Sequence, residues 1–341
     1  MTQLYSLAIG VGTQNSHGEW LEVFYPSPLL NPAPELASAL TQAAGYEGGN
    51  QAIAIDSAAL SSLQAATTDT EQAALLDQLA NSERPVVLTV LATDDAPQTV
   101  PEAYLKLHLI SHRLVKPHHT NINGIFGTLK NVAWTSEGAI DIEELTARQL
   151  KARIEGRSLS VNCVDKFPKM TDYVVPSGVR IAHTARVRLG AYIGEGTTIM
   201  HEGFVNFNAG TVGTSMIEGR ISAGVFIGEG SDLGGGSSVM GTLSGGGKLV
   251  NSMGNNCLIG ANAGTGIPLG DRTTIEAGLY ITAGTKVTVL DDKNQPIETV
   301  KAQELAGKSD LLFIRNSLTG AVVCKTNKSA VELNEELHAN N

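Results

Sequence analysis

The chain is poor in cysteine and has neither a long apolar run nor a basic cluster. Its three cysteines, Cys163, Cys257 and Cys324, are far apart and odd in number, which argues against a disulfide framework and a zinc site. The N-terminus lacks the basic start and long apolar core of a signal peptide, so we expect a cytoplasmic protein. The net charge of −10, without any run of Lys and Arg, argues against a nucleic-acid partner.

Common nucleotide-binding and hydrolase motifs are missing as well. GVGTQN at 10–15 has Asn15 where a dinucleotide-binding fingerprint needs its third glycine. GGGKL at 245–249 has Leu249 after the lysine, where a P-loop carries Ser or Thr. There is no His-Glu-x-x-His pattern and no nucleophile elbow. The chemistry must therefore come from the repetitive second half of the chain.

Glycine is abundant, with 37 residues, and an aliphatic residue returns at most sixth positions between Ile181 and Val287. A hexapeptide period is the signature of a parallel β-helix, and the small residues between the marked positions suit its tight corners. A β-sandwich rich in turns is the less favoured alternative, because it has no reason to keep such a count. The marked positions are Ile181, Val187, Ile193, Ile199, Val205 and Ile217 in one phase, then Ile221, Ile227, Leu233, Val239, Leu269, Ile275, Ile281 and Val287 in a second.

Interruptions of the period predict where the coil is modified. One shift of four residues separates the two phases, between Ile217 and Ile221. The second phase is weakest from Gly245 to Ala263, so we expect a loop to leave the coil near 241–256. Loops that leave a regular scaffold often carry function.

The first half has a different texture and predicts an α+β N-terminal domain. Strand patterns at 4–12, 20–25, 52–55 and 86–92 alternate with helical patterns near 33–43, 57–66, 70–81 and 100–115. A strand pair is expected at 124–135 and a helix from Asp141 to Ile154. We place the N-terminal domain at 1–170, the β-helix at 171–290 and a C-terminal cap segment at 291–341. In that cap, a short helix and two closing strands, LLFIRNS and AVVCKT, would cover the last coil.

Larger polar and aromatic residues break the small-residue pattern from Met200 onward, at MHEGFVNFNAGT. With eighteen residues per coil, His183 would stack beneath His201 and, if the loop before Ile217 preserves the register, Glu202 would stack beneath Arg220. A surface histidine explains His201 equally well, and a structural charge at a subunit contact is the favoured explanation of Glu202.

Glu218 is the stronger candidate for chemistry. It lies at the phase shift, beside Arg220, in a turn flanked by glycine. A carboxylate placed next to a cation at a break in a scaffold is a plausible functional group, and a structural ion pair is the alternative.

Long strings in the second half resemble one family. MHEGFVNFNAGT, IEGRISAG, GSDLGGGSSVMGTLSGGG, LIGANAGTGIPLGD, IEAGLYITAGT and LLFIRNS are similar to the tetrahydrodipicolinate N-succinyltransferases of bacterial lysine and diaminopimelate synthesis, in their long form with a large N-terminal domain. The resemblance extends from near Val175 to the end. It implies a left-handed β-helix, a homotrimer with active sites between neighbouring helices, and transfer of a succinyl group from succinyl-CoA to the amino group of tetrahydrodipicolinate.

The same resemblance implies roles for single residues. Glu218 matches the family's essential carboxylate, which acts either through an acyl-anhydride intermediate or as a base. Glu202 matches a position that binds magnesium on the trimer axis, although Ala185 stands where some relatives carry an acidic second ligand. The residues that match succinyl-CoA contacts are Arg220, Gly235, Ser238, Ala261, Glu276, Ala277, Gly284, Lys301, Arg315, Asn316 and Ser317.

Three alternatives share the predicted helix. An acyltransferase that uses acetyl-CoA or a sugar would differ in its acyl pocket. A γ-type carbonic anhydrase needs three metal-binding histidines, and the predicted helix contains only His183 and His201. A non-catalytic trimeric scaffold would show no CoA-dependent thermal shift.

Overall fold

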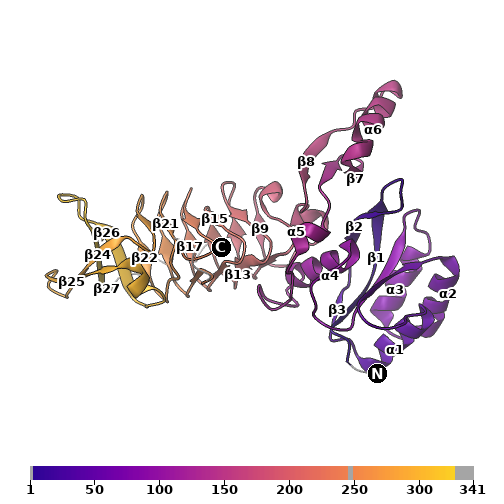
Figure 1. Cartoon of the computed structure of the whole chain (residues 1–341), viewed down its shortest axis with the longest axis horizontal. Coiled ribbons are helices and arrows are strands. Elements are labelled where there is room, and N and C mark those ends of the chain that lie inside the picture. Colours follow the sequence, from indigo (N-terminus) through magenta and orange to yellow (C-terminus); the bar gives the residue numbers. More distant parts are fainter. Residues whose placement is uncertain (1–2, 245–248, 327–341) are drawn as a thin grey trace. The chain divides into compact units, whose positions relative to one another are not determined.

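The computed structural model describes residues 3–244 and 249–326, which form two compact units (Figure 1). The first unit contains the residues up to 109 together with 119–168 and 172–174. The second contains 110–118, 169–171 and the chain from 175 onward. Part of the predicted glycine loop, 245–248, and the end of the predicted cap segment, 327–341, lie outside the described residues.

An antiparallel sheet in the order β2-β1-β5-β4 forms the base of the first unit, and β3 also pairs with β1. The strands expected at 4–12, 20–25, 52–55 and 86–92 are all present. Every residue of β5 is buried, because both faces of the sheet are covered. The strands are β1 (Ser6–Gln14), β2 (Trp20–Phe24), β3 (Leu29–Leu30), β4 (Gln51–Ile55) and β5 (Val86–Leu91).

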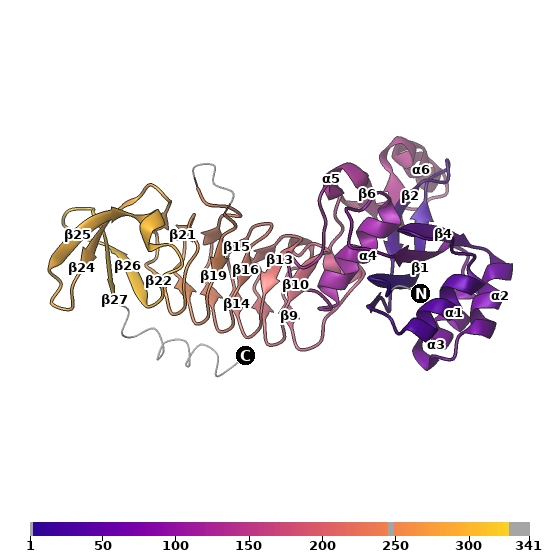
Figure 2. The ribbon, with the colours of Figure 1, turned by 60° about the horizontal axis from the view of Figure 1, so that its bottom comes forward.

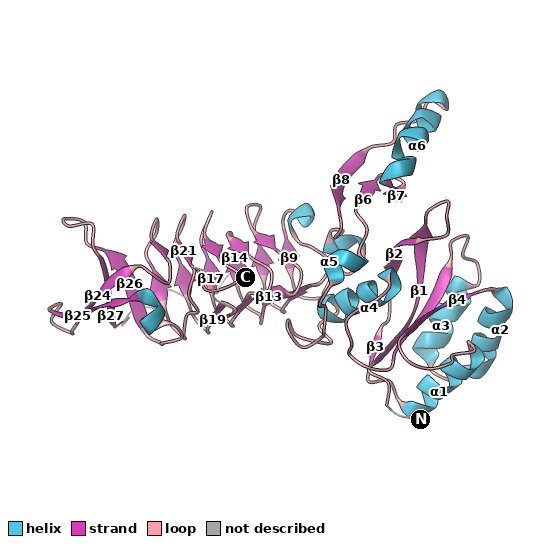
Figure 3. Ribbon diagram, in the orientation of Figure 1, coloured by secondary structure: helices cyan, strands magenta, loops and turns pink. Residues whose placement is uncertain are grey.

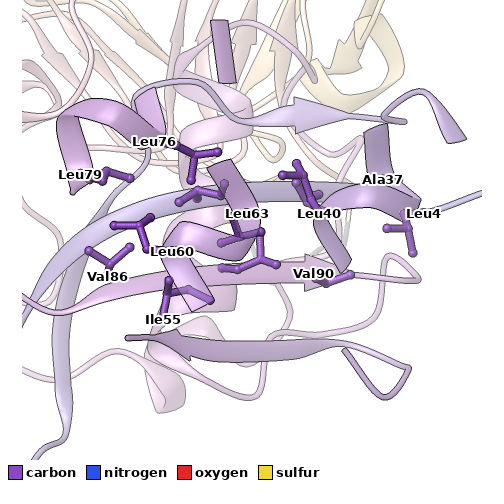
Figure 4. Packing of buried hydrophobic residues seen from close by; sticks show 13 residues of the cluster. Leu4, Ala37, Leu40, Ile55, Leu60, Leu63, Leu76, Leu79, Val86 and Val90 are labelled. Carbon is purple, nitrogen blue, oxygen red and sulfur yellow. The ribbon is translucent and has the colours of Figure 1, made fainter. Parts of the chain in front are cut away.

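Helices α1 (Pro34–Ala43), α2 (Ser57–Ala66) and α3 (Thr70–Leu79) cover one face of this sheet. Leu40, Leu63 and Leu76, one from each helix, are fully buried in the same cluster as Val90 of β5 (Figure 4). No helix in the described part of the chain is both long and apolar enough to span a membrane.

Helix α4 (Val100–Ser111) covers the opposite face of the sheet. Thr89 of β5 points to this face, because it alternates with Leu88 and Val90, which belong to the leucine cluster. The Tyr25 hydroxyl lies 2.7 Å from Thr89 Oγ1 and donates to Pro101 O at 3.1 Å. The Tyr25 N–H donates to His108 Nε2 at 3.2 Å. Buried polar contacts therefore fix this helix on the sheet.

A smaller antiparallel sheet, in the order β7-β6-β8, completes the first unit (Figure 3). The predicted helix is α6 (Ile142–Ile154), and the Asp141 carboxylate caps it by accepting the Glu143 N–H at 3.1 Å. The expected strand pair at 124–135 is wrong in its first part. Gly124 has a φ of +76°, and this left-handed turn starts the single helical turn α5 (Ile125–Thr128). The strands are β6 (Val132–Thr135), β7 (Gly138–Asp141) and β8 (Val161–Asp165).

The second unit is a parallel β-helix, in which very short strands stack in three sheets (Figure 2). Marked positions such as Ile199, Val205, Ile217 and Ile221 are fully buried, which confirms the inward role of the period. The first sheet contains β9 (Arg180–Ile181), β11 (Thr198–Ile199), β14 (Met216–Ile217), β17 (Asp232–Leu233), β20 (Leu258–Ile259) and β22 (Thr274–Ile275). The second contains β12 (Phe204–Val205), β15 (Arg220–Ile221), β18 (Ser238–Val239), β21 (Gly264–Thr265) and β23 (Tyr280–Ile281). The third contains β10 (Ala191–Ile193), β13 (Ala209–Thr211), β16 (Phe226–Ile227) and β19 (Ser252–Met253).

The length of a coil varies more than the sequence pattern suggests. Ile199 pairs with Ile217, eighteen residues on, but Ile217 pairs with Leu233, sixteen on, and Leu233 with Ile259, twenty-six on. The expectation of a single shift is therefore wrong, since the long coil breaks the phase again and Leu269 restores it. Corners tolerate different residue counts because only the strand positions must present an inward side chain.

The predicted stacking of Glu202 beneath Arg220 is also wrong. Arg220 pairs with Phe204, because the coil between them has sixteen residues. In the preceding coil the eighteen-residue register holds, with Ile181 opposite Ile199.

Closing strands cover the last coil, as expected from the sequence. Phe313 is fully buried and pairs in parallel with Ile275, so β26 continues the first sheet. β26 then pairs with β27, and β27 with β24. The elements are β24 (Lys286–Leu290), β25 (Pro296–Lys301), β26 (Leu311–Arg315), β27 (Val322–Thr326) and the 3-10 turn η3 (Ala302–Leu305). Two further 3-10 turns are η1 (Met170–Asp172) and η2 (Thr184–Arg186).

Candidate active site

The corner that leads from the first sheet to the second carries Glu218. Its N–H donates to Leu233 O on the next coil at 2.8 Å, and its side chain is half-buried. Gly235 lies beside it on that coil, since a Cβ added there would be 3.4 Å from Glu218 Oε2. Apart from its own chain neighbours, that Cβ would meet no other described atom within 4 Å. The missing side chain therefore leaves space next to the carboxylate.

Other predicted donor-binding residues occupy the same corner on later coils. The Gly278 N–H donates to Ala261 O at 2.8 Å, which joins the Ala261 turn to the turn of Glu276 and Ala277. Glu276 Oε2 in turn accepts the Arg315 N–H at 2.7 Å. Residues from successive coils therefore stack at this corner in a row parallel to the axis of the β-helix. They are Glu218, Gly235, Ala261, Glu276, Ala277 and Arg315.

Arg315 is the last residue of β26, and Asn316 and Ser317 begin the exposed turn between β26 and β27. Asn316 Oδ1 accepts the Leu318 N–H at 3.0 Å, and the Arg315 guanidinium donates to Gly320 O at 3.2 Å. Side chains of the turn therefore stabilise the turn itself. Its tip presents Leu318, which is 95% exposed.

The outer face of the second sheet begins directly beyond this corner. The strand register places Phe204, Arg220, Ser238, Gly264 and Tyr280 side by side, one from each coil. We call these five residues the outer row. Arg220 and Ser238 are among the ligand contacts that the family resemblance implies. Tyr280 was not predicted to lie in this row, because its place beside Gly264 follows from a coil of sixteen residues.

Gly284 and Lys301 lie apart from the corner. Gly284 follows β23, so it is on the other side of the second sheet, in a turn where the Ala283 N–H donates to Ser244 Oγ at 2.6 Å. The Ala302 N–H donates to Thr285 O at 2.8 Å, which holds Lys301 next to this turn. Predicted donor-binding residues therefore border the second sheet on both sides.

Glu202 lies in the exposed turn between β11 and β12, next to His201. The Arg186 guanidinium donates to its backbone oxygen at 3.0 Å. Within residues 3–244 and 249–326, no group of three or more His, Cys, Asp or Glu side chains is close enough to hold a metal ion. Within one copy of the chain, the described residues thus do not form the predicted magnesium site.

The buried thiols are poor candidates for a nucleophile. Burial raises the pKa of Cys257 to about 11 and that of Cys324 to about 12. Because the thiolate is the reactive form, both are inert near neutral pH.

Two family models match parts of the chain. The model described as "Tetrahydrodipicolinate N-succinyltransferase middle" matches residues 129–169, which cover β6, α6 and β8. The model described as "Hexapeptide repeat of succinyl-transferase" matches residues 250–283 of the β-helix.

Full-length relatives carry one name, 2,3,4,5-tetrahydropyridine-2,6-dicarboxylate N-succinyltransferase. The protein of this name from Pseudomonas putida is 67% identical over 340 residues, and that from Vibrio cholerae is 61% identical, each match covering 99% of both chains. A crystal structure from Campylobacter jejuni, provisionally named a 2,3,4,5-tetrahydropyridine-2-carboxylate N-succinyltransferase, has a TM-score of 0.90 and 30% identity. That match covers 97% of this chain and 94% of the other.

Proposed function

The chain belongs to the tetrahydrodipicolinate N-succinyltransferase family, and we propose that it transfers a succinyl group from succinyl-CoA to the amino group of ring-opened tetrahydrodipicolinate, L-2-amino-6-oxopimelate. The thioester C–S bond breaks, an amide C–N bond forms, and a proton from the amine reaches the departing thiolate. The products are the N-succinyl compound and free CoA. The observation that carries this proposal is the identity of 61–67% over 99% of the chain to relatives of that name.

We assign the catalytic role to Glu218. Its carboxylate would act either by taking the acyl group as a mixed anhydride or by removing a proton from the amine. General-base assistance of this kind is worth about 10² to 10⁴ in rate. The half-buried position and the free space at Gly235 support either role, because the reacting group must come within about 3–3.5 Å of the carboxylate.

The corner and its neighbourhood would bind succinyl-CoA. Turns built from Gly235, Ala261 and Ala277 let a ligand approach backbone amides closely, because no large side chain covers them. Arg220 and Ser238 flank the corner on the second sheet. Beyond that sheet, Gly284 and Lys301 form a second contact region, where the lysine would meet a CoA phosphate.

We further infer a left-handed coil and a homotrimer with the site between neighbouring helices. The hexapeptide-repeat match and the exposed position of the outer-row Arg220 in a single chain support this arrangement. Three copies would bring three Glu202 side chains together, and only such an assembly could create the magnesium site. No step of the proposed reaction depends on it. The cytoplasmic location stays a prediction.

The proposal is tested by following CoA thiol release with tetrahydrodipicolinate as acceptor. Succinyl-CoA should give one thiol per N-succinyl product, and acetyl-CoA should react much more slowly. Equal rates with both donors would overturn the succinyl assignment. Absence of thiol release, together with no thermal shift on adding CoA, would favour a scaffold instead.

A further inference from the structure

Ser237 carries a buried hydroxyl directly next to the turn of Glu218. It occupies the same corner on the following coil, where the Arg220 N–H donates to its backbone oxygen at 2.8 Å. A Cβ added to Gly219 would be 2.2 Å from Ser237 Oγ, so the hydroxyl lies against the backbone of Gly219. The Ser237 side chain is fully buried, and its oxygen has no hydrogen-bond partner among residues 3–244 and 249–326.

Buried hydroxyls at another corner of the coil differ from Ser237 in this respect. On four coils the corner from the third sheet to the first carries one, and each lies 2.7–3.3 Å from an oxygen partner; they are Thr197, Ser215, Ser231 and Thr273. Packing does not need a hydroxyl at 237, because Ala263 takes the equivalent place on the next coil and is also buried. A buried hydroxyl without a partner is destabilising, and this makes a functional role the better explanation of Ser237.

The peptide between Glu218 and Gly219 supplies a poorly satisfied acceptor. The Glu218 N–H donates to Leu233 O at 2.8 Å, a normal length. The Gly236 N–H, in contrast, is 3.4 Å from the Glu218 backbone oxygen, beyond the usual range of about 2.7–3.2 Å. The corner therefore combines an unused donor with a weakly bonded acceptor, and both belong to the contact between the Glu218 turn and the next coil.

We propose that Ser237 is a positioning residue for Glu218, whose backbone oxygen accepts the Ser237 hydroxyl when the acyl group is transferred. This inference rests on the proposed function. A rotation of the peptide between Glu218 and Gly219 exchanges the long hydrogen bond from Gly236 for one from the hydroxyl. Glycine at 219 permits this rotation, because it has no Cβ that would collide with Ser237 Oγ. The turn that carries the Glu218 carboxylate is thereby fixed in its reacting position.

The test compares Ser237→Ala with the unaltered protein, by the thiol-release assay and by urea unfolding. The substitution keeps a methyl-sized side chain, which fits at the equivalent Ala263, and removes only the donor. Because one hydrogen bond of the reacting state is lost, kcat should fall about twofold to tenfold, with the KM of both substrates unchanged. The urea midpoint should stay the same or rise, because no hydrogen bond of the resting structure is removed.

Ser231→Ala is the matched control. Ser231 is equally buried, but its hydroxyl donates to Gly254 O at 2.7 Å and accepts the Cys257 N–H at 2.9 Å. This control should therefore lower the urea midpoint and leave kcat unchanged.

An unchanged kcat in Ser237→Ala would overturn the proposal, as would a loss confined to KM or a drop of the urea midpoint as large as that of Ser231→Ala. If the unaltered protein does not release CoA from succinyl-CoA, the proposed function is wrong and the role of Ser237 falls with it. If it does and kcat is the same in Ser237→Ala, only the role of Ser237 is wrong.

Discussion

The substitution Gly235→Ala should lower activity without lowering the stability of the fold. Gly235 does not have a positive φ, and the added methyl would meet only Glu218 Oε2, at an ordinary contact distance of 3.4 Å. The fold should therefore tolerate it, and loss of glycine freedom in the unfolded chain should add about 0.4–1 kcal/mol to the unfolding free energy. The methyl nevertheless occupies the zone of about 3–3.5 Å that a reacting group needs. We expect kcat/KM to fall at least about tenfold, equivalent to about 1.4 kcal/mol in the barrier.

Two other Gly→Ala variants make this result interpretable. In Gly219→Ala the new Cβ would lie 2.2 Å from Ser237 Oγ and 2.7 Å from Ser237 O, so overpacking should cost about 1–3 kcal/mol of stability. Gly127→Ala, which meets nothing within 4 Å, should affect neither stability nor activity by much. Denaturant titration and the thiol-release assay give the two quantities. Full activity in Gly235→Ala, or a stability loss equal to that of Gly219→Ala, would refute the geometry assigned to Glu218.

Two further predictions concern groups outside the reaction. Iodoacetamide at pH 8 should modify Cys163, which is exposed. The buried Cys257 and Cys324 should stay unmodified in the native protein, because burial raises their pKa values to about 11 and about 12. Mass spectrometry that finds all three cysteines modified would contradict this prediction. Burial raises the pKa of Glu22, so the native state holds this proton more tightly than the unfolded state, and stability should fall as pH rises from about 4.5 towards the raised value. Glu22→Gln should remove this pH dependence of the unfolding free energy. The unfolding free energy can be followed by the fluorescence of the two tryptophans, which are both in the first unit. An unchanged pH dependence in the variant would show that Glu22 is not the group responsible.

Much of the coil is predictable because one residue type at one spacing determines it. An aliphatic side chain such as Ile217 points inward at most strand positions, and this six-residue spacing is typical of a parallel β-helix. The register between coils is less predictable. Whether Arg220 stacks on Glu202 or on Phe204 depends on two residues at a corner, where small polar residues carry no period.

The candidate site was predictable only in part. Glu218 and Arg220 could be singled out because they lie where the period slips, and the resemblance supplied the other residues. The position of the Tyr280 ring could not be found from its own local pattern, since the ring lies over Gly264 in the previous coil. The helical turn at Ile125–Thr128 was missed because a segment so short carries no measurable period and its start depends on the conformation of Gly124.

Substitution of Glu218 by glutamine tests the central claim most directly. The amide keeps the size of the side chain but can neither accept an acyl group as an anhydride nor remove a proton. The account predicts that thiol release from succinyl-CoA nearly disappears, while CoA at about 100 times its dissociation constant still stabilises the protein by about 2.7 kcal/mol and the native mass is unchanged. Retained turnover in Glu218→Gln would contradict the account and remove this carboxylate from the mechanism.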